Sequence, residues 1–270
     1  MRIPILVLIA LLMAAPAPAH ALDGATVQRL MAAGQAAEAR SLAVEAAAQG
    51  DWRAAHFASW ALLGGVGGPV DRDQGLALAE QAAASGDWIA RYDQAKALSD
   101  DVVTMPQARA LFTALAGEGY SPAMLRLADD PALPELDRAG WIERAAALGH
   151  PTAFAMMAAR QDDTVAAGRL LRQAALSGHL ASALTLAEQQ RQDKAEAVSW
   201  LMLASARLMG GDYYCGERVD PDRLAEMVRG VLPLPEPAVL QPRIDALLAA
   251  YARAPWPCNL ECEPWRPELW

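Results

Sequence analysis

Apolar and small residues recur along most of the chain in a fixed pattern that ends each time at a glycine. Five such glycines are separated by 36, 33, 30 and 29 residues: Gly50, Gly86, Gly119, Gly149 and Gly178. The large apolar residues eight positions before them are Leu42, Leu78, Leu111, Trp141 and Leu170. The positions four and three before each glycine hold alanine, except for Leu115. These positions share one helical face, and glycine commonly ends a helix in the left-handed conformation. The pattern predicts helices that each end at one of these glycines.

The length of the repeat predicts pairs of helices stacked in a row. About thirty residues hold two helices of roughly a dozen residues each and two short turns. Self-similarity at this period is typical of a solenoid, in which each unit buries its apolar face against its neighbours. A half-copy precedes Leu42 and a drifting copy runs through Trp200, Ala204 and Gly210. We therefore predict an all-α fold, an α-solenoid of about five to six helix-turn-helix repeats over residues 22–211.

Two stretches resemble the Sel-1-like repeat family, which is related to the tetratricopeptide repeats. The first is Gly65-Val66-Gly67-Gly68-Pro69-Val70-Asp71, followed by Ala77, Ala82, Ala83 and Gly86. The second, from Trp141 to Gly149, is similar and has an aromatic residue at the family's usual place. The resemblance covers roughly residues 36–210. It implies a scaffold of multiprotein assemblies, often at cell envelopes.

A stack of helix pairs presents one helix of each pair on a concave surface, where we expect a protein or peptide partner to bind. A groove over several repeats offers roughly 800 Å² to a partner, which is enough for a specific complex. The segments expected to line it are Ala54–Leu63, Ala90–Leu98, Ala123–Leu127, Thr152–Ala159 and Leu180–Glu188. The sequence does not identify the individual binding residues.

The first 21 residues have the features of a secretory signal peptide. Arg2 precedes an apolar run from Ile3 to Ala15, and a small-x-small site ends at Ala21. This arrangement predicts cleavage after Ala21 and a periplasmic or secreted protein; the alternative is an uncleaved anchor. The apolar run is too short to span a bilayer comfortably, so no membrane span is expected after cleavage.

The charge of the chain excludes some partners. The net charge is −9, and removal of Arg2 with the signal peptide makes it −9 − 1 = −10. An acidic chain without a basic stripe argues against binding to nucleic acid or to anionic membrane surfaces.

Residues 212–270 differ from the repeats and are expected to form a C-terminal helical cap followed by a tail rich in proline and tryptophan. Helices are predicted over residues 221–229 and 237–252, and four later prolines forbid regular structure to the end. All three cysteines, Cys215, Cys258 and Cys262, lie here. In an oxidising compartment we expect one disulfide that pins the cap, between Cys215 and either Cys258 or Cys262, with Cys258–Cys262 as the alternative. The longer loop would stabilise the fold by roughly 3–4 kcal/mol.

Several polar residues have both a structural and a functional interpretation. His150 and His179 each follow a repeat glycine, and they are either polar caps or a metal or proton-sensitive site. Adjacent acids recur between helices, as Asp100-Asp101, Asp129-Asp130 and Asp162-Asp163. Helix capping explains them adequately, and an acidic rim that attracts a basic partner or a divalent cation is the alternative. We favour the structural interpretation in both cases.

No signature of catalysis is present, since the chain lacks the HExxH and GxSxG motifs and a paired CxxC spacing for zinc. The glycines from Gly64 to Gly68 indicate a tight turn, and Trp52 and Trp88 are expected to pack between repeats rather than to bind a ligand. We therefore expect no catalytic residues, no metal site and no cofactor. The sequence favours an exported, non-catalytic scaffold or adaptor for protein–protein interaction in the bacterial envelope. The alternative is a periplasmic hydrolase acting on cell-wall fragments.

Overall fold

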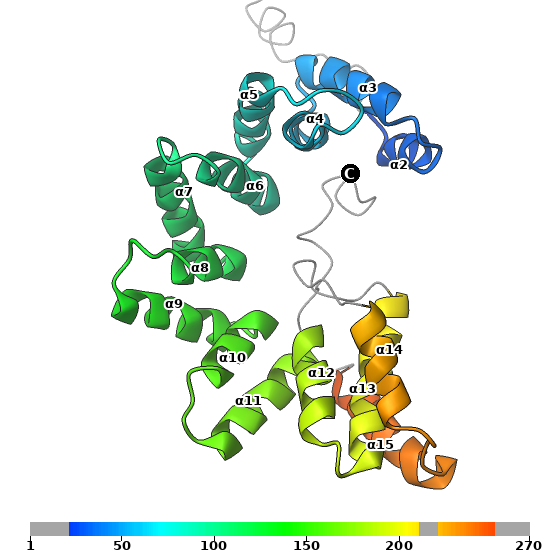
Figure 1. The fold of residues 1–270 in the computed structure, drawn as a ribbon. Coiled ribbons are helices and arrows are strands. Elements are labelled where there is room, and N and C mark those ends of the chain that lie inside the picture. Colours follow the sequence, from blue (N-terminus) through cyan, green and yellow to red (C-terminus); the bar gives the residue numbers. More distant parts are fainter. Residues whose placement is uncertain (1–21, 211–220, 252–270) are drawn as a thin grey trace, which may run out of the picture. The chain divides into compact units, whose positions relative to one another are not determined.

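The computed structural model describes residues 22–210 and 221–251, and every regular element in these ranges is an α-helix (Figure 1). The chain divides into two compact units, which meet in sequence at Thr104 and Met105. The first unit holds α2 (Gly24–Ala32), α3 (Ala36–Ala48), α4 (Trp52–Gly64), α5 (Arg72–Ala83) and α6 (Trp88–Ser99). The second holds α7 (Met105–Gly117), α8 (Ser121–Ala128), α9 (Glu135–Ala147), α10 (Pro151–Ala158), α11 (Thr164–Ser177), α12 (Leu180–Gln189), α13 (Lys194–Gly210), α14 (Pro221–Gly230) and α15 (Pro237–Tyr251).

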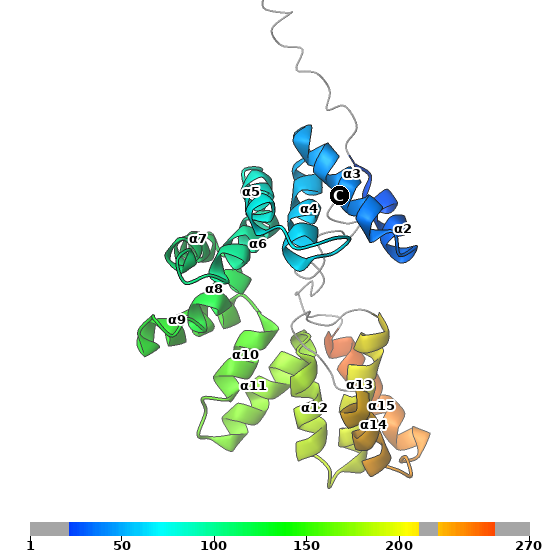
Figure 2. The same ribbon diagram turned by 45° about the horizontal axis from the view of Figure 1, so that its top comes forward.

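Within each unit the helices stack in the order of the sequence. From α2 to α6, and again from α7 to α13, each helix packs chiefly against the helix before it and the helix after it. Figure 2 shows this succession of antiparallel pairs from a second side. Contacts between sequence neighbours are what a repeat architecture requires. The predicted all-α stack of helix pairs is confirmed.

The five repeat glycines end the helices as predicted. They follow α3, α5, α7, α9 and α11, and their φ angles lie between 83° and 124°. Two further predicted copies also form helices: the half-copy before Leu42 is α2, and the last copy is α13.

Aspartates begin many of the helices. The N-cap carboxylates of α2, α4, α5, α6 and α11 accept hydrogen bonds from free backbone N–H groups: Asp23, Asp51, Asp71, Asp87 and Asp163. Such a cap typically contributes about 1 kcal/mol. The acidic pairs lie between helices as predicted, but only the third supplies a helix N-cap, through Asp163. Asp101 and Asp130 instead accept hydrogen bonds inside the turns that precede α7 and α9, from the N–H groups of Val103 and Ala132.

The glycine-rich loop after α4 closes against the start of α3. Gly65 has a left-handed conformation and ends α4, as the predicted turn requires. Gly67 has φ of 73°, and a Cβ added to it would lie 2.3 Å from the carbonyl oxygen of Ala36. Arg40 donates a hydrogen bond of 2.8 Å to the carbonyl of Pro69. Only glycine at position 67 allows the two backbones to come this close.

The two units have different cores. The first is built mainly from alanines around Phe57, which is fully buried between α2, α3 and α4. Small residues let neighbouring helix backbones approach closely. The second unit has a larger cluster around Trp200 of α13, and this tryptophan is also fully buried. Residues of α11, α12, α14 and α15 contribute to the same cluster.

The C-terminal helices α14 and α15 cover the last face of the second unit. Their bounds agree within one residue with the predicted helices. Met227, Val231 and Leu240 are buried against α13, and α15 also packs against α11. Arg243 of α15 donates two hydrogen bonds, of 3.0 and 3.1 Å, to the carboxylate of Asp193 at the start of α13. The cap is therefore present in the described residues and is held by apolar and ionic contacts.

Three predictions fall on residues outside the described ranges and stay predictions. They are the signal peptide over residues 1–21, the disulfide among Cys215, Cys258 and Cys262, and the tail after residue 251. The proposed domain bounds at residues 21 and 211 border these segments. In the described part of the chain, no helix combines the length and the apolar character that crossing a membrane requires.

Candidate functional site

Of the helices predicted to line a groove, α4, α8 and α12 bury more than half of their residues, and α6 and α10 bury half or fewer. In α8 every side chain except that of Arg126 is buried, and eight residues of α4 are buried. A helix buried on most of its circumference offers few side chains to a partner. For these buried helices, a partner would therefore have to bind at the edges between neighbouring helices.

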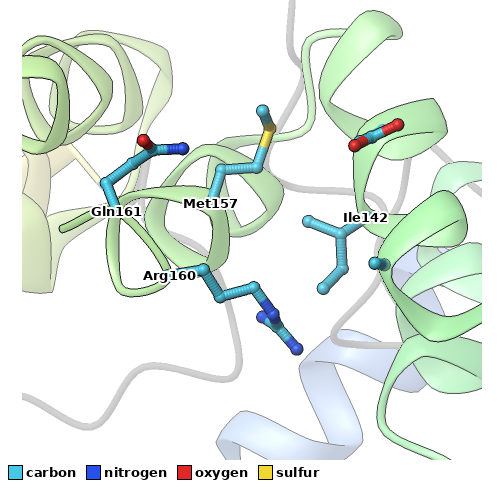
Figure 3. A pocket seen from close by; sticks show the side chains of 6 residues that line it. Ile142, Met157, Arg160 and Gln161 are labelled. Carbon is cyan, nitrogen blue, oxygen red and sulfur yellow. The ribbon is translucent and has the colours of Figure 1, made fainter. Parts of the chain in front are cut away.

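One such edge forms a pocket between α9 and α10 of the second unit. Its volume is about 120 Å³, and six residues line it: Ala139, Ile142, Glu143, Met157, Arg160 and Gln161. Ile142 and Glu143 follow Ala139 by about one helical turn on α9, and the others lie at and just after the end of α10. Figure 3 shows Met157, Arg160 and Gln161 on one side of this space and Ile142 on the other.

The chemistry of this pocket is an apolar floor with a charged rim. Ile142 is 1% exposed and closes the floor, whereas Glu143 and Gln161 are exposed at the rim. The side chain of Arg160 is 41% exposed; its guanidinium lies 3.8 Å from the carboxylate of Glu135 and donates a 3.4 Å hydrogen bond to the carbonyl of Met156. A pocket of this kind can hold a small apolar group that carries a polar end.

An ionic cluster built around a buried histidine lies between α4 and α6 of the first unit. The Nε2 atom of His56 lies 2.8 Å from Oδ2 of Asp93, and the ammonium of Lys96 lies 3.1 Å from Oδ1 of the same carboxylate. The side chain of His56 is 7% exposed and that of Asp93 is 24% exposed. Lys96 also lies over the ring of Tyr92, 5.6 Å from its centroid.

The surroundings of Asp93 keep it ionised. Burial alone would raise the pKa of this carboxyl group, but the hydrogen bond from His56 and the charge of Lys96 oppose burial and lower the pKa below its ordinary value of 3.8. The two partners occupy both carboxylate oxygens, which is how buried charges are normally compensated. The cluster therefore joins two helices of the first unit.

His150 and His179 are helix N-caps, as the structural interpretation predicts. Nδ1 of His150 accepts a 3.2 Å hydrogen bond from the N–H of Thr152 in α10, and Nδ1 of His179 accepts one of the same length from Ser182 in α12. His150 is fully buried. Burial, and then the charge of His179, lower the pKa of His150 from 6.5 to about 3, so its ring is neutral at neutral pH.

The acidic pairs do not gather into a cation site in the described residues. There, no three side chains of histidine, cysteine, aspartate or glutamate are grouped so that they could hold a metal ion. Asp130 instead pairs with the guanidinium of Arg109, on α7. The hydrogen bond from Arg109 lowers the pKa of Asp130.

The two tryptophans that follow repeat glycines differ in their surroundings. Trp52 packs against a cluster of alanines from α3 to α6, which confirms its predicted role between repeats. Trp88 is 45% exposed and is therefore less buried than the same prediction requires.

The sequence did not reveal the His56–Asp93 pair or the α9–α10 pocket. A weak signal exists for the pair: His56 stands six residues after Gly50 and Asp93 seven after Gly86, so they occupy nearly equivalent places in adjacent repeats. Residues at equivalent places face one another when repeats stack. No comparable sequence signal exists for the pocket, because the spacing of Ala139 and Ile142 indicates only that both lie on one apolar face of α9.

Comparison with known proteins identifies the fold. No protein-family model and no curated protein matches the sequence. The crystal structure of a Sel1 repeat protein from Oxalobacter formigenes matches with a TM-score of 0.55 and 16% identity, over 84% of this chain and all of that chain. This likeness shows a common fold and confirms at that level the resemblance stated for roughly residues 36–210.

Two other solved structures match less well. They are c5321, a protective antigen of uropathogenic Escherichia coli strains with an SLR fold, and the immunity protein Pa5087 from Pseudomonas aeruginosa. For c5321 the TM-score is 0.48 and the identity 18%, over 87% of this chain and 58% of that chain. For Pa5087 the values are 0.44 and 15%, over 88% and 86%.

Proposed function

We propose that this chain, which has the fold of a Sel1 repeat protein, is an exported, non-catalytic scaffold that binds a protein or peptide partner in the bacterial envelope. The observation that carries the proposal is the stacking of helix pairs chiefly against their sequence neighbours from α2 to α6 and from α7 to α13, with an open apolar pocket at one edge of the second unit. Repeat architectures of this kind bind partners along the surface that the stack leaves open.

Export is supported by the pattern of residues 1–21. A charged start, a short apolar run and a small-x-small site together are typical of a cleavable signal. The measurement is the mass of the N-terminus of the protein isolated from a bacterial host, together with its distribution among cell fractions. We expect a chain that begins at Leu22 in the periplasmic fraction, and a cytoplasmic chain that retains Met1 would refute export.

The non-catalytic role is supported by the surroundings of the buried histidine. An imidazole next to a carboxylate is one half of the arrangement that activates a nucleophile, so the His56–Asp93 pair favours the rival hydrolase more than any other feature does. In the part of the chain that the structure describes, however, Nε2 of His56 faces Asp93 and no serine hydrogen-bonds to the ring. Lys96 takes the remaining carboxylate oxygen.

A hydrolysis screen separates the two functions. The mature chain and its His56→Gln variant are incubated with soluble peptidoglycan fragments, and products are detected by mass spectrometry. We expect no turnover by either protein. Turnover that the substitution abolishes, in a protein that stays folded, would establish the hydrolase.

Partner binding is tested by site-specific photo-crosslinking in intact cells. A photoreactive amino acid replaces Gln161 at the rim of the pocket, and a second protein carries it at the exposed Arg169 of α11 as a control. We expect a protein adduct at position 161 that is absent or much weaker at position 169. Equal labelling at both positions would indicate collision rather than binding and would refute the proposal for this surface.

A further inference from the structure

We propose that the pocket between α9 and α10 is an anchor site for one aliphatic side chain of a partner polypeptide, and that a carboxylate next to this side chain pairs with Arg160. The inference rests on the proposed function as a binding protein and names the chemistry that this site recognises. Three observations carry it: the size of the pocket, its apolar floor, and the placement of charge at its rim.

The size of the pocket selects a single side chain. Small-molecule and cofactor sites occupy about 300–1,000 Å³, whereas an apolar cavity of about 150 Å³ holds a molecule the size of benzene. The α9–α10 pocket, at about 120 Å³, is too small for a cofactor and is suited to a leucine-sized group. Anchors of this size in pockets are a common feature of protein interfaces.

The floor of the pocket is suited to an aliphatic group. Ile142 is almost completely buried at the base, and the small side chain of Ala139 leaves room above it. Met157 forms part of the opposite wall, and a methionine side chain adapts its shape to a neighbouring group at low cost. In Figure 3 the side chains of Met157 and Ile142 lie on opposite sides of the space.

The charges at the rim select the polar end of the ligand. A guanidinium has five N–H donors. In Arg160 one guanidinium nitrogen lies 3.8 Å from a carboxylate oxygen of Glu135, and another lies 3.4 Å from the carbonyl oxygen of Met156. Both contacts are long, so a carboxylate from a partner can take a closer, bidentate position on Arg160. Glu143 is exposed at the rim on the α9 side and disfavours a carboxylate there. A partner therefore places its acid toward α10.

The test uses N-acetyl-leucine as a defined probe, because its α-carbon carries both an aliphatic side chain and a carboxylate. The mature chain is labelled with ¹³C at the methionine methyl groups, and the methyl resonance of Met157 is followed during titration. Its assignment comes from the Met157→Leu variant. We expect a saturable shift with a Kd on the order of millimolar, as for other fragments of this size. The exposed Met202 of α13 is the internal reference and should not shift.

Two related probes and three variants make the assignment specific. N-acetyl-leucinamide lacks the carboxylate and should bind about 3- to 10-fold more weakly, and N-acetylglycine lacks the side chain and should cause no saturable shift. Ala139→Leu fills the pocket and should abolish the Met157 shift. Arg160→Gln should lower the affinity for N-acetyl-leucine to that for the amide, whereas the control Arg169→Gln on α11 should leave it unchanged.

The outcomes separate this inference from the function on which it rests. An equal response to N-acetylglycine, or a Met157 shift that persists in a folded Ala139→Leu protein, would overturn the anchor site. If Ala139→Leu does not fold, an unchanged affinity in Arg160→Gln would overturn the carboxylate pairing. If the probe does not bind but a protein adduct forms at position 161, the anchor site fails and the scaffold function stands. If the probe binds and no adduct forms, the pocket stands and the scaffold function fails.

Discussion

Each of the two units buries a histidine, and the surroundings of the two rings are opposite in kind. In the first unit, His56 of α4 lies 2.8 Å from the carboxylate of Asp93, and Lys96 completes a compact ionic cluster. In the second unit, His150 caps α10 through Nδ1, and the nearest titratable group that influences its charge is another imidazole, that of His179. The ring of His56 is thus buried against a negative charge, whereas the ring of His150 is buried where a second imidazole influences it.

The difference teaches how two buried histidines in one repeat architecture can couple the stability of their units to pH in different ways. The ordinary pKa of histidine is 6.5, and burial lowers that of His150 to about 3, so the unfolded chain binds one proton more than the folded second unit between these pH values. The second unit must therefore lose stability as the pH falls below 6.5. In the first unit the pKa of Asp93 is lowered, so the stability that its carboxylate contributes is present above pH 3.8 and is lost only as the pH falls through the lower folded value.

The largest effect is expected from a pair of glycine substitutions, one in each unit. Gly67 and Gly119 both have positive φ, but only Gly67 faces a backbone, whereas a Cβ on Gly119 meets nothing within 4 Å. Gly67→Ala should destabilise the first unit by about 3–4 kcal/mol, because backbone strain adds to the collision with Ala36. Gly119→Ala should cost the second unit only about 1–2 kcal/mol. Hydrogen exchange of peptides from α3 and α7 measures the two losses of stability. Equal losses would contradict the role of the close approach between Gly67 and the backbone of Ala36.

Removal of the negative charge from the buried cluster is expected to have the next largest effect. Asp93→Asn leaves His56 buried without a carboxylate, and breaking a buried pair from one side typically costs about 3 kcal/mol. The loss should be seen at pH 7 as faster hydrogen exchange in α4 and α6. The matched control is Lys96→Gln, at the i,i+3 partner of Asp93. The side chain of Lys96 is 46% exposed, so its replacement should change hydrogen exchange in α4 and α6 little. A larger loss from Lys96→Gln than from Asp93→Asn would show that the cluster depends on the lysine.

Replacement of the histidine in the second unit should remove its sensitivity to acid. His150→Asn keeps an N-cap acceptor that does not titrate. The wild-type unit should lose about 1.4 kcal/mol per pH unit below pH 6.5, which amounts to about 2.7 kcal/mol at pH 4.5, and the variant should lose that much less. Urea unfolding at pH 7.5 and pH 4.5, followed by pulsed hydrogen exchange in α9 and α10, gives the comparison. The same acid loss in both proteins would exclude His150 as its source.

The smallest effect is expected at the ionic contacts of the C-terminal cap. Arg243 pairs with Asp193 on the surface of the second unit, and exposed ion pairs contribute little. Arg243→Ala should raise the exchange rates of α15 a few-fold and leave those of α10 unchanged, because Leu240 and its apolar neighbours still hold the helix. Complete exchange of α15 in the variant would show that the ion pair, and not the apolar contacts, secures the cap.

Local features of the fold could be predicted from the sequence because they depend on residues close together in the chain. The left-handed glycines after α3, α5, α7, α9 and α11 belong to this class, and so do His150 and His179, which accept hydrogen bonds from residues two or three positions later. The acidic pairs were predicted less well. Asp129-Asp130 was expected to cap a helix, but Asp130 pairs with Arg109, which lies 21 residues earlier on another helix.

The period of glycine and alanine by itself determined that this protein is a row of helix pairs, since helix ends and buried faces follow from short-range periodicity. Only the tertiary structure decided which side chains meet across the row. His56 reaches Asp93 over 37 residues, and Ala139 and Met157 enclose a pocket, because the rotation of each helix against its neighbour is set by packing rather than by any local rule. Contacts between helices decide the chemistry of the surface, and that is where binding is determined.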